Sequence, residues 1–509
     1  MARPLLLPSL GLAVVAGALY FLAFPGFDYW PLALVAFVPM LWALDARHAQ
    51  SGARHSTRRV LLLGALFGLV TNMGGYYWLV GMLEDFSGFS FVLCVFFAAV
   101  VCTFQGGLLM VFAWLYHRAR GRGFRALAAA PLAFGAAEMA YPLLFQSYYA
   151  NHFHEQPALI QIADLGGPIL ISMLAIAVNA ILYELLRARL AGRPLPFKAT
   201  GVVAGAVAAT LAYGAFQIAR VDALAAEAPS ITVGLVQVNM GIFAKRDDPW
   251  EGRRRHVEMT RALEADVDPD LVIWPESAVT FFLPEGTNVK RHVMGPVETP
   301  LLFGGLARRT VDGRERHYNT AYLVDEDGEV LGTYDKTYLL AFGEYLPFGE
   351  TFPSLYDVSP HSGRFTPGDH VRPLRWGDYR ISALVCYEDI IPRFVRSAVL
   401  EGDPHLLVNM TNDAWFGDTS EPWQHLALAK MRAVEHHRYL VRSTNSGVSA
   451  VIDPVGRTLG HIGVFEEGSL HEEVHMMTGW TLYQTLGDWP GWASLGGIFM
   501  LAFRRRPRA

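Results

Sequence analysis

Three residues with reactive or charged side chains each follow a short run that has the composition of a strand. They are Glu276, Lys336 and Cys386, which follow the runs 271–275, 332–335 and 381–385. A carboxylate can take the proton of a thiol, the sulfur can then attack an acyl carbon, and an ammonium can hold the oxyanion that forms. The combination therefore predicts covalent acyl transfer through Cys386. Taken singly, the cysteine is also explained as a small buried hydrophobe, and the two charges as a helix-start anion and a solvated strand end.

The composition places the chain among membrane proteins. Hydrophobic residues make up 52% and charged residues only 17% of the 509 positions, which is unusual for a soluble protein of this length. The long apolar runs are confined to 1–221 and 491–503, and the chain between them has an ordinary soluble composition. The net charge of −5 indicates no particular partner, and the absence of a basic stripe with interleaved aromatic residues in the sequence argues against nucleic acid.

Eight apolar runs are candidates for membrane helices, since a bilayer core of about 30 Å needs roughly 20 helical residues. The second and eighth are short, and the fifth contains Glu138, whose role stays open. The first has no convincing signal-peptide cleavage site, so we expect a retained helix. The eight runs are Leu5–Phe24, Trp30–Leu44, Val60–Leu83, Phe91–Tyr116, Leu127–Phe145, Ile160–Leu186, Thr200–Ile218 and Gly491–Phe503.

The distribution of Lys and Arg orients these helices. Basic residues gather near the N-terminus, in the connections 45–59, 117–126 and 187–199, and in the tail 504–509, whereas the loops 25–29, 84–90 and 146–157 contain none. Cationic loops stay on the cytoplasmic side. The pattern predicts a bacterial inner-membrane protein with both termini in the cytoplasm. Its domains would be 1–221 with seven helices, a periplasmic catalytic domain at 222–490, and 491–509 with the eighth helix and a basic tail.

The cysteines agree with a chemical role for the external segment. Cys94 and Cys102 fall in one apolar run, whereas Cys386 is the single cysteine of residues 222–490. Oxidising compartments usually pair their cysteines, so an unpaired external thiol favours a chemical function.

Short β-branched runs alternate with helical stretches in the external segment, which predicts a layered α/β sandwich. Residues 220–229 are expected to form a linker. Helices are predicted near 251–264 and 423–437, and strands at Ile231–Val238, Leu271–Trp274, Leu301–Gly304, Ala321–Val324, Ile381–Val385, His405–Met410 and Val448–Ile452.

Several motifs in this segment resemble those of a known family. They are Trp-Pro-Glu-Ser at 274–277, Tyr-Asp-Lys at 334–336, Phe-Gly-Glu-Tyr-Leu-Pro at 342–347, Cys-Tyr-Glu-Asp at 386–389 and Asn-Asp-Ala-Trp-Phe-Gly at 412–417. With the membrane frame they resemble the apolipoprotein N-acyltransferases, a membrane-embedded branch of the nitrilase superfamily. The resemblance covers essentially the whole chain. One departure is Asn239-Met240-Gly241-Ile242 followed by Lys245-Arg246, where family members often have Asn-Ile-Pro-Gln and then Lys-Trp.

The resemblance implies a four-layer αββα domain and a ping-pong reaction through a Cys386 thioester. Glu276 would be the general base and Lys336 the oxyanion stabiliser. Glu344 would be a second catalytic carboxylate, and substrate-binding roles would fall to Tyr387, Glu388, Asn412 and Trp415.

The substrates that the resemblance implies are lipids and lipoproteins. The acyl donor would be a phospholipid, typically phosphatidylethanolamine losing its sn-1 chain, and the acceptor the α-amine of a diacylglyceryl-cysteine on an apolipoprotein. No cofactor or metal is implied, and we expect a monomer. Apolar runs at 281–283 and 339–342 are candidates for a lipid-facing rim, with buried packing as the alternative.

Two other functions stay open. A membrane-tethered nitrilase-type amidase would use the same thiol chemistry and pass the acyl group to water or a small amine. A non-catalytic membrane binding protein would keep only the fold, although the presence of Glu276, Lys336 and Cys386 together argues against it. His436 and His437 are not expected to bind metal, because Cys386 has no His or Cys partner at ligand spacing.

Overall fold

The structure is a computed structural model that describes residues 6–45, 56–241, 248–283, 286, 288–340, 343–346, 348–358 and 362–503. Parts of several sequence predictions lie outside these ranges: the basic residues of 46–55 and 504–509, Lys245 and Arg246, and the apolar pair 341–342. The chain divides into two compact units. One comprises residues 1–219, 419–431 and 481–509 and is called the helical unit. The other comprises residues 220–418 and 432–480 and is called the sandwich unit.

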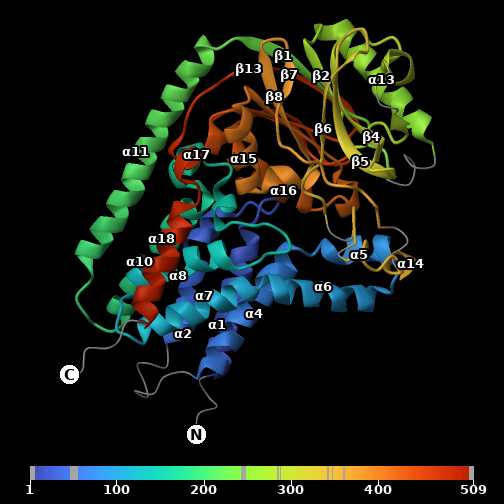
Figure 1. Cartoon of the computed structure of the whole chain (residues 1–509). Helices are drawn as coiled ribbons and strands as arrows, with labels where there is room; N and C mark the ends of the chain where they lie inside the picture. Colours follow the sequence, from blue (N-terminus) through green and yellow to red (C-terminus); the bar gives the residue numbers. More distant parts are fainter. Residues whose placement is uncertain are drawn as a thin grey trace. The chain divides into compact units, whose positions relative to one another are not determined.

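In the helical unit, α1 packs on α4, α4 on α7, α7 on α8, and α8 on both α10 and α18 (Figure 1). The backbone of α4 passes close to the start of α7. A Cβ atom at Gly68 on α4 would lie 2.4 Å from the carbonyl oxygen of Gly106, the residue before α7. The elements are α1 (Leu6–Leu22), η1 (Trp30–Leu34), α2 (Phe37–Asp45), α4 (Thr57–Gly75), α5 (Leu79–Ser87), α6 (Phe91–Gln105), α7 (Gly107–Arg120), α8 (Ala126–Ala140), η2 (Tyr149–Phe153), α9 (Pro157–Ile160), α10 (Ala163–Leu190), α11 (Phe197–Glu227), α17 (Leu482–Leu486) and α18 (Trp489–Phe503).

Three helical stretches of the described chain are long and apolar enough to cross a membrane: Phe91–Arg120, Ala163–Leu190 and Phe197–Glu227. A fourth candidate is the pair Thr57–Gly75 and Leu79–Asp85, which is bent by 62°. The other apolar helices are shorter than the roughly 20 residues that a bilayer requires, among them α8 with 15 residues. The prediction of eight spans is therefore not confirmed, and it stays a prediction, as do the domain limits after residues 221 and 490.

The predicted linker at 220–229 is wrong over most of its length. Helix α11 continues to Glu227 and is 31 residues long. Residues 220–227 read Arg-Val-Asp-Ala-Leu-Ala-Ala-Glu, and Ala, Leu, Glu and Arg are among the strongest helix formers. Their intrinsic propensity extends the helix beyond the apolar run that marked its predicted end.

The sandwich unit contains two mixed β-sheets in its described part. The first has the order β13-β1-β2-β4-β5-β6, with β3 paired to β4, and the second has the order β12-β11-β10-β9-β8-β7. The strands of the first sheet are β1 (Ser230–Gln237), β2 (Leu271–Ile273), β3 (Phe282–Leu283), β4 (Leu301–Val311), β5 (Arg314–Val324), β6 (Val330–Asp335) and β13 (Gly468–His475). Those of the second are β7 (Leu374–Trp376), β8 (Tyr379–Val385), β9 (Leu406–Thr411), β10 (Tyr439–Thr444), β11 (Ser449–Ile452) and β12 (Thr458–Ile462).

The two sheets meet face to face between helices. Ser443 on β10 donates a hydrogen bond to the carbonyl oxygen of Ile273 on β2 at 3.1 Å, and Thr444 donates to Gln237 on β1 at 2.7 Å. Helix α13 (Pro249–Val267) packs on β1 and β13, and α15 (Pro392–Gly402) packs on β8. The predicted αββα layering is confirmed. The remaining elements are η3 (Lys290–Met294), α14 (Leu355–Val358), η4 (Cys386–Ile390), η5 (Asp413–Phe416) and α16 (Glu421–His436).

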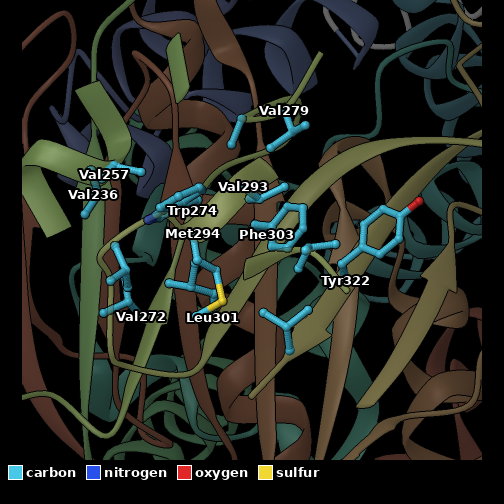
Figure 2. Close-up of a cluster of buried hydrophobic side chains, with 14 of the residues drawn as sticks. Val236, Val257, Val272, Trp274, Val279, Val293, Met294, Leu301, Phe303 and Tyr322 are labelled. Atoms are coloured by element: carbon cyan, nitrogen blue, oxygen red, sulfur yellow. The ribbon is translucent and has the colours of Figure 1, made fainter. Parts of the chain in front are cut away.

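An apolar core packs around the end of β2, the strand that precedes Glu276. Trp274, Phe303 and Tyr322 lie in one buried cluster with Val257 of α13 (Figure 2). Trp274 is fully buried, and its indole N–H donates to the hydroxyl of Thr260 at 2.9 Å. Because this large side chain is both packed and hydrogen-bonded, it anchors the end of β2 two residues before Glu276.

The strands predicted from β-branched runs all form, as do the helices predicted near 251–264 and 423–437. The sequence reading missed β3, β7, β10, β12 and β13. Strand β13 alternates between half-buried and exposed positions, and β10 contains Arg442. Neither strand offers the continuous apolar run from which the other strands were predicted.

Candidate active site

Cys386 occupies a sharp turn between β8 and η4. Its φ angle is +54°, a left-handed conformation that a side chain with a Cβ rarely adopts without support. The support comes from Asn409, whose amide donates to the carbonyl oxygens of Cys386 at 3.1 Å and Leu384 at 3.3 Å. The strained turn places the thiol at the end of the strand, where the sequence predicts it.

The structure brings the four predicted catalytic residues together. The Lys336 Nζ atom lies 2.8 Å from Glu344 Oε2 and 3.5 Å from Glu276 Oε1. The charges of Glu276 and Lys336 both act on the Cys386 thiol. Asn319, which the sequence analysis missed, donates from Nδ2 to Glu276 Oε1 at 2.7 Å and to Glu344 Oε1 at 3.0 Å. The Cys386 thiol, the two carboxylates and the Lys336 ammonium therefore belong to one cluster.

Burial sets the protonation states of this cluster. It raises the pKa of the Glu276 carboxyl, and the charge of Glu344 acts in the same direction, while Lys336 opposes the shift. Burial and the neighbouring Glu276 also raise the pKa of the Cys386 thiol. Burial alone would lower the pKa of Lys336, but Glu344, Cys386 and Glu276 together raise it. The thiol thus keeps its proton at rest beside a carboxylate of increased basicity, and Lys336 stays cationic.

Glu276 is positioned by a close approach of two backbones. It follows β2, and Ser277 after it has a φ angle of +56°. A Cβ atom added at Gly304 on β4 would lie 2.7 Å from the Cα atom of Glu276 and 2.8 Å from the carbonyl oxygen of Pro275. Only glycine at position 304 allows β4 to pass this close to the Glu276 backbone.

Replacing Gly304 by alanine is therefore expected to displace Glu276, lower the rate of Cys386 acylation and destabilise the fold by about 1–3 kcal/mol. Gly305→Ala is the matched control, because its Cβ would make ordinary contact with the Tyr322 ring at 3.4 Å. Thermal unfolding and acyl-adduct formation would be measured for both variants. Equal behaviour of the two variants would contradict this account of how Glu276 is held.

Glu388 accepts hydrogen bonds from two backbone segments of the site. It is fully buried, and its Oε1 atom accepts hydrogen bonds from the backbone N–H groups of Thr337 at 2.8 Å and Tyr338 at 3.0 Å. Its Oε2 atom accepts from the Val385 N–H at 2.7 Å. Burial raises the pKa of Glu388 to about 7, although these donors oppose the shift. Glu388 therefore links the segment after Lys336 to the strand before Cys386, and its predicted contact with substrate stays a prediction.

A second buried carboxylate network lies behind the cysteine turn. Arg442 on β10 donates to Asp389 at 2.9 Å, to Asp413 at 2.7 Å and to Asn409 Oδ1 at 2.7 Å. All three charged side chains are at most 1% exposed. Since Asn409 binds the Cys386 carbonyl, Arg442 orients the turn through it. The sequence signal for this network is an arginine directly after the apolar run Tyr439–Val441.

The remaining predicted site residues, Tyr387, Asn412 and Trp415, are each half-buried. The Tyr387 ring stacks on Tyr338 with centroids 6.0 Å apart and an interplanar angle of 15°. Asn412 begins η5, and its Oδ1 atom accepts from the amide of Asn445 at 3.2 Å. Trp415 is half-buried in the same turn. Their predicted contacts with substrate stay predictions.

Comparison with known proteins decides the family. A family described as the apolipoprotein N-acyltransferase N-terminal domain matches residues 16–181, and carbon-nitrogen hydrolase matches residues 232–479. The apolipoprotein N-acyltransferase of Geobacter metallireducens is 32% identical over 97% of this chain and 95% of its own. The chain belongs to the apolipoprotein N-acyltransferase family.

Other apolipoprotein N-acyltransferases agree over similar lengths. The protein of Azotobacter vinelandii is 33% identical over 95% of this chain and 94% of its own, and that of Rhizobium rhizogenes is 29% identical over 96% and 94%. Among solved structures, Saccharomyces cerevisiae Nit3 of the nitrilase superfamily has 17% identity and a TM-score of 0.38, covering 48% of this chain and 90% of its own. The curated relatives and the matched domain identify the chain as an acyltransferase with a carbon-nitrogen hydrolase domain.

Proposed function

We propose that this chain transfers an acyl group from a phospholipid to the N-terminal amine of a diacylglyceryl-cysteine on a lipoprotein, through a thioester on Cys386. The observation that carries the proposal is the buried cluster in which Lys336 pairs with Glu276 and Glu344, because the charges of these groups act on the Cys386 thiol. The names of the relatives supply the substrate class.

In the first half-reaction Glu276 takes the thiol proton as the sulfur attacks the carbonyl carbon of a phospholipid ester. Lys336 stabilises the oxyanion of the tetrahedral intermediate. Its collapse breaks the bond to the glycerol oxygen, which receives the proton from Glu276 and leaves as a lysophospholipid. Phosphatidylethanolamine losing its sn-1 chain is the proposed donor. The acyl group is left on Cys386 as a thioester.

In the second half-reaction the α-amine of the lipoprotein attacks the thioester carbon. Glu276 accepts a proton from the attacking amine, Lys336 again holds the oxyanion, and the proton passes to the leaving sulfur. An amide and a free thiol result, so the enzyme returns to its starting state without a cofactor. Glu344 keeps Lys336 in place at 2.8 Å during both steps.

The donor also requires an apolar route to Cys386, because exposing an acyl chain to water costs about 0.8 kcal/mol for each CH₂. Phe282 and Leu340 come from the two apolar runs beyond Glu276 and Lys336, and each is 37% exposed. We infer that these side chains rim the lipid entrance. Residues 222–490 would then face the periplasm at the surface of the inner membrane.

Leu340→Asp is expected to lower acylation by phosphatidylethanolamine about ten-fold or more, because a charge at the rim opposes entry of an acyl chain. Acylation by a short water-soluble ester should change little. Leu400→Asp is the matched control, since Leu400 is a 55% exposed leucine on α15. Equal use of phosphatidylethanolamine by wild type and Leu340→Asp would remove Leu340 from the rim.

The choice of acceptor separates the transferase from an amidase. Chain that has been acylated on Cys386 is mixed with a diacylated lipopeptide, with a small amine or with buffer alone. We expect the lipopeptide to discharge the thioester at least about 10²-fold faster than water, since only its lipid anchors would orient the amine. Equally fast discharge by buffer would favour the amidase.

A further inference from the structure

The helical unit contains a cavity of about 30 Å³ that is lined by both polar and apolar residues. A volume of about 10–15 Å³ suffices for one water-sized occupant. Among the described residues that line the cavity there is no Lys, Arg or His. The polar lining residues are Tyr20, Thr71, Asn72, Tyr76, Gln105, Glu138 and Ser147.

Two buried oxygen atoms at this cavity have no hydrogen-bond partner in the described part of the chain. Glu138 is 5% exposed, and its Oε1 atom accepts from the Tyr149 N–H at 2.8 Å and the Ser172 hydroxyl at 3.1 Å. Its Oε2 atom has no partner among the residues that the structure describes, and neither has the hydroxyl oxygen of Thr71, a residue that is 2% exposed. Buried oxygens without partners are costly, so two of them on one cavity indicate a ligand that binds oxygen.

The backbone makes the cavity more negative. Tyr20, Asn72 and Glu138 lie in the last turns of α1, α4 and α8, which end at Leu22, Gly75 and Ala140. The C-terminal end of a helix carries a partial negative charge equivalent to about half an electron charge. Three such ends therefore add to the carboxylate of Glu138.

We propose that this cavity binds one monovalent alkali cation, with Glu138 and Thr71 among its oxygen ligands. A single carboxylate neutralises a single positive charge, whereas a divalent ion would leave an uncompensated charge inside an apolar helix bundle. Phe24 and Phe134 also line the cavity, and aromatic rings can attract cations. The site lies outside the acyl-transfer machinery and uses none of its residues.

Equilibrium dialysis of the full chain in detergent micelles against ²²Na⁺ or ⁸⁶Rb⁺ tests the proposal. We expect saturable binding that approaches one cation per chain, with ⁸⁶Rb⁺ standing in for potassium. Glu138→Gln should abolish this binding, and Thr71→Val should weaken it about ten-fold. Asp85→Asn removes an exposed carboxylate of α5 and should leave binding unchanged.

Thermal unfolding gives a second readout, since a cation that binds only the folded chain stabilises it by mass action. Replacing N-methylglucamine chloride by NaCl or KCl at constant ionic strength should raise the unfolding temperature of the wild type and of Asp85→Asn. Absence of saturable binding, or identical binding by Glu138→Gln, would overturn the proposal. Should Glu138→Gln not fold, unchanged cation affinity in folded Thr71→Val would overturn it instead.

Discussion

Glu276→Gln slows acylation of Cys386 by phosphatidylethanolamine about 10²–10⁴-fold. Glutamine keeps the size of the side chain and can still accept from Asn319, which donates to Glu276 at 2.7 Å, but it cannot take the thiol proton. Single-turnover acylation followed by intact mass spectrometry measures the effect.

The pH dependence of the same rate distinguishes loss of a base from a disturbed site. Because burial raises the pKa of Glu276, the wild-type rate should fall as the pH drops through a value above the ordinary carboxyl pKa of about 4.3. Glu276→Gln should lack this acidic limb. Glu473→Gln, which alters an exposed residue of β13, should behave like wild type. Near-normal acylation by Glu276→Gln would exclude Glu276 as the base.

Lys336→Met is expected to lower the acylation rate by about 10²–10³-fold and to destabilise the sandwich unit by about 3–5 kcal/mol. Lys336 is 1% exposed and lies between Glu276 and Glu344. Methionine fills a similar volume, so both effects report the missing charge. The acylation rate falls because the oxyanion has no cation, and the stability falls because two buried carboxylates face each other. Acylation by intact mass spectrometry and thermal unfolding measure the two effects.

A double variant separates the effect on the acylation rate from the effect on stability. Lys336→Met combined with Glu344→Gln removes one of the two carboxylates and should recover part of the lost stability. It should not recover acylation, since the oxyanion still has no cation. Recovery of both quantities together would mean that Lys336 serves only the fold.

The sequence predicts the reactive centre better than it predicts the surrounding support. Glu276, Lys336 and Cys386 could be predicted from the sequence because each directly follows a strand-like run. The ends of strands gather at one edge of a sandwich. The alternation of β-branched runs with helical stretches predicted a layered α/β sandwich, whereas the αββα order was implied by the family resemblance.

The supporting residues come from long-range contacts that spacing does not encode. Asn319 on β5 meets Glu276 across 43 positions, and Arg442 meets Asp389 across 53. Gly304 is one of 48 glycines, and the sequence does not distinguish it from the others. The structure shows its role, because the Glu276 backbone passes close to it. The end of α11 was misplaced for a different reason, because hydropathy marks the apolar part of a helix and not its last turns.

Intact mass spectrometry of the purified chain after incubation with phosphatidylethanolamine tests the central claim most directly, with Cys386→Ala alongside. We predict a gain of one acyl mass that maps to Cys386, is absent in Cys386→Ala and is lost when a diacylated lipopeptide is added. Folded wild-type chain that gains no acyl mass, or that transfers the acyl group equally well without Cys386, would contradict the thioester route.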